Sequence, residues 1–441
     1  MDLRKRCTLL SLALGFGILI GTLTLMVAAA SGSSPLERNA TDRYVATTGV
    51  DFGDCSDLAA PCASVQYAVD VANDGDTVLV ATGIYTGVQA RGTYTQMVHL
   101  TRTLTIRGGF GSDFGTWDPR YFPTMLNAQF EGRVFYINGN ASPVIEGLII
   151  AYGDAEAGGG ASYGGGVLAI GSSGPSLTVT LRHNYIVINS ATTAGPSDGG
   201  HGGGLSFIFS NAVLEDNTIA HNLTDGSGGG LRMEQSNGRL RDNVILDNYA
   251  LGTNSGTGGG VYLTNLASVY MTNTVIADNA VSYGGAGMVV AGAYARLVHT
   301  TIARNSGGDG SGIYIGIGGL HSPGAISMTN SIVVSHAVGI TVTTAPPMMP
   351  ENTATLDGIL WYANGQNTGG GGTIDVMHAI TGDPAFLSDG YHIGSGSAAI
   401  DQGVATRATL DIDGETRPAG AGPDLGADEL WHRTHLPVVQ K

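Results

Sequence analysis

Short apolar strands recur along the middle of the chain, and each follows a cluster of glycines. The clusters end at Gly166, Gly204, Gly230, Gly260, Gly287 and Gly312. The first and third residues after each cluster form two apolar rows: Val167, Leu205, Leu231, Val261, Met288 and Ile313; then Ala169, Phe207, Met233, Leu263, Val290 and Ile315. The second residue varies, as expected where side chains alternate between a buried and an open face. We therefore predict a short strand after each glycine cluster, with the glycines forming the turn before it.

A row of isoleucines marks the same repeat a second time. It comprises Ile186, Ile219, Ile245, Ile276, Ile302 and Ile332, separated by 33, 26, 31, 26 and 30 residues. Three residues after each isoleucine stands a polar residue, namely Asn189, Asn222, Asn248, Asn279, Asn305 and Ser335. Two rows with one period predict a solenoid, in which each coil buries its apolar face against its neighbours. We expect the asparagines to stack and hydrogen-bond along the coil axis as structural residues.

The repeat is too short for a β-propeller, whose blades take ~40 to 50 residues and usually carry tryptophan signatures. The pattern instead resembles the right-handed parallel β-helix proteins of the pectate-lyase-like superfamily. The resemblance implies an all-β fold, a right-handed single-stranded parallel β-helix, which we place at residues 95–380. Residues 31–94 are expected to form an N-terminal cap, because Cys62–Ala72 resembles the short capping helix of such proteins. Ser64 is a suitable N-cap for that helix, and the helix would cover the open edge of the first coil.

The start of the chain has the layout of a secretory signal. Arg4, Lys5 and Arg6 precede an apolar run and then Ala28-Ala-Ala30, so we predict a signal at residues 1–30 and an extracellular or cell-surface location. An uncleaved membrane anchor is the alternative, because the run is long enough to span a bilayer. In an exported chain, Cys55 and Cys62 form an even pair and predict a disulfide; two free buried thiols are the other interpretation.

The charge of the chain limits its partners. The formal net charge is −16, and loss of three basic residues and one acidic residue with the signal makes it −18. Lys441 is then the one remaining lysine, which argues against a nucleic-acid or anionic-membrane surface. We expect a monomer whose partner is an extracellular polysaccharide or cell-surface glycan, with any membrane contact made through the signal or an anchor.

Residues 381–430 form a separate C-terminal module, followed by a tail at 431–441. Its motifs are Gly382-Asp-Pro-Ala-Phe386, Tyr391-His-Ile393, Gly396-Ser-Ala-Ala-Ile-Asp401, Asp411-Ile-Asp-Gly414, Arg417-Pro418 and Asp424-Leu-Gly-Ala-Asp-Glu429. In this order they resemble the choice-of-anchor Q domain of bacterial surface β-helix proteins, which implies display at the cell surface. No cofactor is predicted, although calcium at Asp411, Asp413, Asp424 and Asp428 stays open. The alternative is that these aspartates bond their own backbone in turns.

Catalysts of related polysaccharide-cleaving enzymes project outward from one face of the coil, so the outward rows were compared for paired carboxylates. The row after the glycine clusters is Leu168, Ser206, Arg232, Tyr262, Val289 and Tyr314; two positions on stand Ile170, Ile208, Glu234, Thr264, Ala291 and Gly316. Glycoside hydrolysis needs two carboxyl groups at a set separation, and neither row supplies a pair. We therefore assign no catalytic residue. Arg232, Glu234, Tyr262 and Tyr314 are the candidates for an exposed glycan platform, because aromatic faces and charged groups suit sugar contact.

Three functions stay open. The first is a non-catalytic surface protein for adhesion or polysaccharide binding. The second is a polysaccharide lyase or glycoside hydrolase acting on an acidic glycan, with Arg232 as a possible base or with catalysts in the loops 154–162 and 192–198. His201 lies in a Gly-His-Gly sequence similar to a polygalacturonase motif, but the companion motifs are missing and we assign it to a turn. The third is a structural envelope protein.

Overall fold

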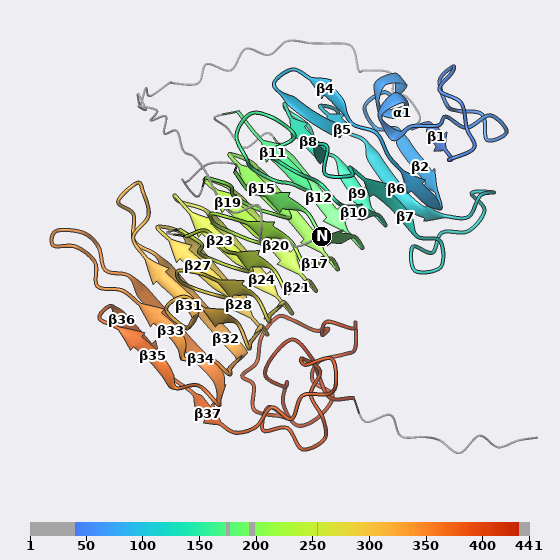
Figure 1. Cartoon of the computed structure of the whole chain (residues 1–441). Coiled ribbons are helices and arrows are strands. Elements are labelled where there is room, and N and C mark those ends of the chain that lie inside the picture. The colour runs from blue at the N-terminus through green and yellow to red at the C-terminus, as the bar shows by residue number, and fades with distance from the viewer. Residues whose placement is uncertain (1–39, 173–176, 194–198, 254, 432–441) are drawn as a thin grey trace, which may run out of the picture.

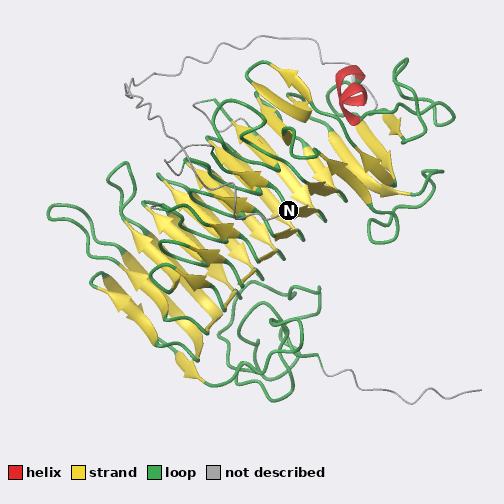
Figure 2. Ribbon diagram, viewed as in Figure 1, coloured by secondary structure: helices red, strands yellow, loops and turns green. Residues whose placement is uncertain are grey.

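The computed structural model describes residues 40–172, 177–193, 199–253 and 255–431. The predicted signal at 1–30, residues 432–441 of the tail and residues 194–198 of the second candidate loop lie outside this range. Within it, the chain winds into a parallel β-helix whose strands form three sheets (Figures 1 and 2). We call these sheets A, B and C.

Sheet B contains the strands that follow the glycine clusters. Its strands are β4 (Gln89–Arg91), β5 (Tyr94–Leu100), β8 (Arg133–Asn138), β11 (Val167–Ile170), β15 (Leu205–Ile208), β19 (Leu231–Glu234), β23 (Val261–Thr264), β27 (Met288–Ala291), β31 (Ser311–Gly316), β33 (Val338–Val342) and β35 (Gln366–Gly370). All neighbours pair in parallel except the β4–β5 hairpin.

Sheet A contains two strands from most coils, and sheet C adds a short third one. Sheet A comprises β1 (Asp42–Val45), β2 (Thr77–Ala81), β3 (Gly83–Tyr85), β6 (Thr105–Phe110), β7 (Thr124–Asn127), β9 (Val144–Glu146), β10 (Ile149–Ala151), β12 (Thr178–Arg182), β13 (Tyr185–Val187), β16 (Asn211–Glu215), β17 (Thr218–Ala220), β20 (Asn237–Arg241), β21 (Val244–Leu246), β24 (Ser268–Thr272), β25 (Val275–Ala277), β28 (Tyr294–Val298), β29 (Thr301–Ala303), β32 (Ala325–Val334), β34 (Thr353–Tyr362), β36 (Thr373–Val376) and β37 (Ala379–Thr381). Sheet C comprises β14 (Ser190–Ala191), β18 (Leu223–Thr224), β22 (Tyr249–Ala250), β26 (Ala280–Val281) and β30 (Ser306–Gly307).

The register of sheet B confirms the predicted rows. Val167, Leu205, Leu231, Val261, Met288 and Ile313 pair in that order and are fully buried. They belong to one continuous apolar core that runs the length of the coil. The alternation of apolar and variable residues after each glycine cluster was therefore enough to predict where these strands lie and which of their side chains point inward.

The asparagine row forms the expected ladder. The side-chain N–H of each asparagine donates to the next side-chain oxygen at 2.9–3.0 Å, from Asn189 through Asn222, Asn248 and Asn279 to Asn305. A second ladder, which the sequence analysis missed, joins Asn184, Asn217 and Asn243. Both ladders satisfy buried polar groups at the corners of the coil.

The last position of the isoleucine row was predicted wrongly by one residue. Ile302 pairs with Val333, and Asn305 hydrogen-bonds to His336, so Val333 and His336 continue the rows in place of Ile332 and Ser335. Ile332 pairs with Thr301 and points outward. It is nevertheless buried, because the C-terminal module covers this side of the coil. Both faces of the strand therefore carry an apolar side chain. From the sequence pattern alone, the outward Ile332 was taken for the inward residue, which is Val333.

The capping helix forms where it was predicted, although β1, β2 and β3 of the same N-terminal segment already belong to sheet A of the coil. Helix α1 (Val65–Val71) packs against β1, β2 and β5, and the Ser64 hydroxyl caps it by accepting from the Tyr67 N–H. Figures 1 and 2 show α1 at one end of the coil. Cys55 and Cys62 form the predicted disulfide.

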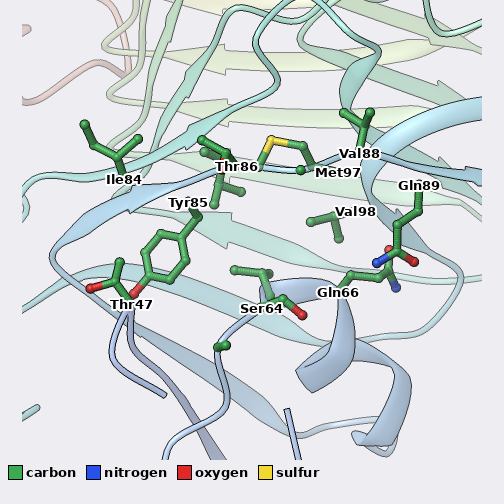
Figure 3. A pocket seen from close by; sticks show the side chains of 14 residues that line it. Thr47, Ser64, Gln66, Ile84, Tyr85, Thr86, Val88, Gln89, Met97 and Val98 are labelled. Atoms are coloured by element: carbon green, nitrogen blue, oxygen red, sulfur yellow. The ribbon is translucent and has the colours of Figure 1, made fainter. Parts of the chain in front are cut away.

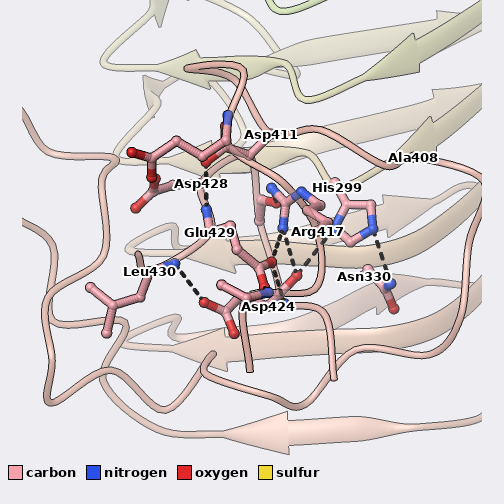
Figure 4. Close-up of polar contacts among 12 residues, drawn as sticks. His299, Asn330, Ala408, Asp411, Arg417, Asp424, Asp428, Glu429 and Leu430 are labelled. Atoms are coloured by element: carbon pink, nitrogen blue, oxygen red, sulfur yellow. Dashed lines mark hydrogen bonds and ion pairs between the residues drawn. The ribbon is translucent and has the colours of Figure 1, made fainter. Parts of the chain in front are cut away.

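The C-terminal module folds back along the outside of the coil (Figure 1). Its apolar residues Ile393, Ala399 and Leu425 form a second core with outward residues of β25, β29, β32 and β34. Figure 4 shows the polar contacts beside this core. Arg417, whose side chain is fully buried, pairs with Glu429 at 2.8 Å, and His299 of the coil contacts the Asp424 carbonyl at 3.1 Å. In the described residues, no helix is long and apolar enough to cross a membrane.

Candidate functional site

The outward row of sheet B is partly covered by the chain itself. Leu168, Ser206, Arg232, Tyr262, Val289 and Tyr314 pair in the predicted register. Leu168 and Ser206 are fully buried and Arg232 is 6% exposed, whereas Tyr262 and Tyr314 are half-buried. The predicted open platform is therefore narrower than the sequence suggested, because the Arg232 guanidinium lies beneath the surface.

Arg232 and Glu234 form one cluster at the centre of this face. Nη2 of Arg232 donates to Oε2 of Glu234 at 2.6 Å, and Nδ2 of Asn265 donates to Oε1 at 2.8 Å. The guanidinium also lies 5.2 Å from the ring centroid of Tyr163. Both carboxylate oxygens of Glu234 thus accept hydrogen bonds, one from Arg232 on the same strand and one from Asn265 in the turn after β23, while its side chain keeps 21% of its surface exposed. A fixed acceptor beside aromatic rings suits recognition of sugar hydroxyls.

Arg232 is unsuited to act as a base. Its guanidinium is ion-paired and buried, and arginine is effectively always protonated. Its Nε and Nη1 find no hydrogen-bond partner among the described residues, but both atoms are shielded from solvent. The sequence hypothesis of an arginine base therefore gains no support from this geometry.

The tyrosines extend the face along the coil axis. Burial, together with the neighbouring Asp309 and Tyr283, raises the pKa of Tyr314. Tyr283 is 64% exposed and was missed by the sequence analysis, because it lies outside the two rows that were compared. Tyr262, Tyr283 and Tyr314 together offer three aromatic side chains on neighbouring coils.

His201 belongs to the repeat, as expected. It takes part in a backbone ladder with Tyr163 and Ser227, and its ring stacks on Tyr163 at 5.2 Å. Nδ1 accepts the Ser227 N–H at 3.0 Å, and burial lowers the pKa of the imidazole well below its usual value. A neutral ring used as an acceptor within the turn fits a structural role.

The two loops proposed as sources of catalysts are anchored by buried charges. The guanidinium of Arg133 donates to the carbonyls of Gly159, Ala161 and Tyr163 and thereby fixes the first loop. Asp225 accepts from Thr193 at 2.8 Å and from Gly200 at 2.8 Å, at the two described ends of the second loop. Burial raises the pKa of Asp225.

A carboxylate pair does occur on adjacent coils, on a corner row of sheet A. Asp216 and Asp242 directly follow Glu215 and Arg241, which pair in register. Burial chiefly raises the pKa of Asp242 to about 6, and the Asp216 charge contributes. The exposed Asp216 contacts Nδ1 of His183 at 2.6 Å, and His183 lies edge-on to Trp117. The repeated Asp-Asn sequence at 216–217 and 242–243 was a signal for this pair, but it lies outside the compared rows.

The four aspartates considered for calcium do not gather around one point. Asp411 and Asp424 each use both oxygens to accept backbone N–H groups. The bonds from Asp413 and Glu415 to Asp411 belong to a turn, whereas Asp401 and Glu429 donate from distant parts of the module. Asp413 and Asp428 instead approach His392, and their ligand atoms all lie within 4.8 Å of one another. Burial lowers the pKa of His392, but the contacts with Asp389 and Asp413 and the charge of Asp428 outweigh it, so the pKa is raised.

A cavity of about 310 Å³ lies beside α1, lined by residues that include Ser64, Gln66, Tyr85 and Met97 (Figure 3). Three of its polar side chains are hydrogen-bonded within the protein. The Tyr85 hydroxyl donates to the Ala81 carbonyl at 2.9 Å, Ser64 donates to Asp51 at 2.7 Å, and Gln66 donates to Asp70 at 2.9 Å. The cavity therefore brings together no obvious catalytic group.

The fold defines the class of protein. The chain belongs to the family of right-handed β-helix proteins, because the family model described as "Right handed beta helix region" matches residues 132–291 and, overlapping them, 165–354. No curated protein matches the chain in sequence.

The solved structures that are similar to the chain include a pectate lyase and a mannuronan epimerase module. Pectate lyase Pel9A is 15% identical, with 89% of this chain and 97% of that chain covered and a TM-score of 0.42. The A-module of the mannuronan C-5 epimerase AlgE4 from Azotobacter vinelandii is 14% identical, with 72% and 91% covered and a TM-score of 0.30. Both likenesses are too distant to support an argument about function.

Proposed function

We propose that the protein is a glycan-binding β-helix that holds a neutral polysaccharide on the outward face of sheet B without cleaving it. The observation that carries this proposal is the Glu234 carboxylate, fixed by Arg232 and Asn265 on the outward face of sheet B that also carries the half-buried Tyr262 and Tyr314. Because Arg232 already neutralises Glu234, the cluster offers hydrogen-bond acceptors rather than a free positive charge. A hydroxyl-rich, uncharged chain fits such a site best.

Binding to a panel of polysaccharides tests this proposal. Tyr262→Ala combined with Tyr314→Ala should weaken retention of a neutral glycan by about three- to tenfold, the range expected for aromatic contacts. Tyr121→Ala, at a tyrosine that is 76% exposed on a loop between β6 and β7, is the matched control and should bind normally. Equal loss in the control, or no loss in the double variant, would contradict the proposed site.

The proposal includes export and display. Residues 1–30 would direct secretion, and the choice-of-anchor Q-like module at 381–430 would serve attachment. N-terminal sequencing of protein recovered from the cell surface tests the first part, with a start at Ser31 expected. Recovery of the intact N-terminus from the membrane fraction would support an uncleaved anchor instead.

A hydrolytic role at Asp216 and Asp242 is the second candidate. A carboxyl whose pKa is raised to about 6, with a second carboxyl on the adjacent coil, is an arrangement that suits the acid and base of a glycosidase. Release of new reducing ends that disappears in Asp242→Asn but persists in Asp375→Asn, at an exposed aspartate of β36, would establish this role. Absence of release from every glycan that binds would reject it.

A further inference from the structure

The outward face of sheet A carries an isolated basic and aromatic surface. Arg239 of β20 pairs in register with Tyr270 of β24, and Tyr270 pairs with Arg296 of β28. All three side chains are exposed, and Tyr294 lies beside them on β28 with 44% of its surface exposed. We call Arg239, Tyr270 and Arg296 the Arg–Tyr–Arg row.

The charges of the row are unusual for this chain. The protein has 36 acidic and 20 basic residues, yet β20, β24 and β28 contain no acidic residue. The neighbouring Arg241 pairs with Glu215 and Asp242. By contrast, neither Arg239 nor Arg296 forms an ion pair or side-chain hydrogen bond with a described residue. Their donors are therefore open to a ligand from solution.

The geometry of the row matches an extended chain. The Arg296 guanidinium lies 5.4 Å from the ring centroid of Tyr270, so the cation and the aromatic face form one contact surface. Neighbouring strands are about 4.8 Å apart, which places the backbones of Arg239 and Arg296 roughly 10 Å from each other, on either side of the Tyr270 backbone. Guanidinium groups bind carboxylates and sulfates through two parallel hydrogen bonds. A tyrosine between them can pack against a sugar ring.

We propose that the Arg–Tyr–Arg row binds an acidic polysaccharide, with the carboxylate or sulfate groups of the glycan on Arg239 and Arg296 and a sugar ring on Tyr270. A nucleic acid is disfavoured, because the surface is small and the rest of the chain is strongly acidic. The row lies on strands other than those of the Glu234 site. The inference therefore stands or fails independently of the proposed function.

The test measures retention of the purified protein on immobilised polygalacturonate, with dextran and duplex DNA as comparison ligands. The double variant R239Q/R296Q should weaken binding to polygalacturonate at least about tenfold, because it removes both bidentate contacts. Binding should also fall as salt concentration rises. The double variant R120Q/R407Q, at two exposed arginines elsewhere, changes the net charge equally and should bind within about twofold of wild type.

Three results would overturn the proposal: no retention on polygalacturonate, an equal loss in R120Q/R407Q, or binding to duplex DNA as tight as to polygalacturonate. Tyr270→Ala should cause a smaller loss of about threefold, through the aromatic contact alone. The Tyr262→Ala and Tyr314→Ala double variant should leave polygalacturonate binding unchanged. This outcome separates the sheet A surface from the sheet B site.

Discussion

Asn248 illustrates how single side chains hold the coils together. Its side-chain N–H groups donate to the carbonyls of Ile219 and Leu246 and to the side-chain oxygen of Asn279, while its own oxygen accepts from Asn222. These contacts are buried, except the one to the Leu246 carbonyl, which is partly buried. Because a buried polar group that loses its partner costs about 1–3 kcal/mol, the ladder couples each coil to the next.

Asn248→Ala should therefore lower the free energy of unfolding by about 2–4 kcal/mol, because it leaves several ladder groups without partners. Asn237→Ala is the matched control: Asn237 is exposed and donates only to Asn211 at the surface. That change should cost less than about 0.5 kcal/mol. Chemical denaturation of the two variants measures the difference, and equal effects would show that the ladder adds no stability.

His299 links the coil to the C-terminal module and should make their contact sensitive to acid. Burial, reinforced by the charge of Arg417, lowers the pKa of His299 to about 3. The stability that the neutral ring provides is complete above its ordinary pKa near 6.5 and is lost as pH falls toward 3. By pH 4.5 the loss should reach about 2 kcal/mol.

His299→Gln should remove this part of the acid sensitivity, since glutamine cannot take up a proton. Thermal midpoints at pH 7 and pH 4.5 should therefore differ less for this variant than for wild type. His321→Gln, at an exposed histidine, should keep the wild-type difference. An unchanged difference in His299→Gln would contradict the assignment.

At the scale of elements, a ladder of alternating charges fixes the register of sheet A. Arg107, Glu146, Arg182, Glu215 and Arg241 occupy one position on five successive coils. Glu146 is ion-paired with Arg107 and Arg182 and is 3% exposed, whereas Glu215 is 28% exposed and pairs with Arg241 at 3.4 Å. A slip of one residue would remove these pairs and turn apolar side chains outward.

Glu146→Gln should destabilise the protein more than Glu215→Gln. The first variant leaves two guanidinium groups without their carboxylate and should cost about 1–3 kcal/mol, whereas the exposed pair should contribute under about 1 kcal/mol. Denaturation at low and moderate salt measures both. Equal costs, or a cost for Glu146→Gln that salt abolishes, would argue against a buried ladder.

The elements also show which parts of the fold the sequence could supply. The strands after the glycine clusters were predictable, because each alternates between one apolar and one variable face. The step from Ile302 to Val333 was not, because Ile332, Val333 and Val334 place apolar side chains on both faces of the strand. Such a run is typical of a strand covered on both sides. This apolar run was the feature of the sequence that indicated that another part of the chain packs against the outer face of the strand.

At the scale of the whole molecule, the C-terminal module is bound to the side of the coil by both apolar and polar contacts. Gly426 and Ala427 donate to Asn330 and Thr301 of the coil, and Asn330 exchanges two hydrogen bonds with Val404. Within the C-terminal module, three of the motif residues form a buried polar network, namely Arg417, Asp424 and Glu429. The order of the motifs was visible in the sequence, but their docking surface arises only from residues brought together by folding.

The candidate site was predictable only in part for the same reason. The row position of Arg232 and Glu234 followed from the repeat, whereas the burial of Arg232 and its contact with the ring of Tyr163, which lies far away in sequence, did not. Asn265 and Tyr283 lie between the strands, where the repeat varies most. The spacing of the sequence repeat therefore could not predict that Asn265 and Tyr283 lie near the site.

The most direct test of the proposed function is incubation of the purified protein with neutral and acidic polysaccharides, while both retention on the glycan and new chain ends are measured. We expect retention on at least one neutral glycan, lost in Tyr262→Ala with Tyr314→Ala, and no release of chain ends. Release of unsaturated or reducing ends would show that the protein is an enzyme. Failure to bind any neutral glycan would contradict the assignment of sheet B as the binding face.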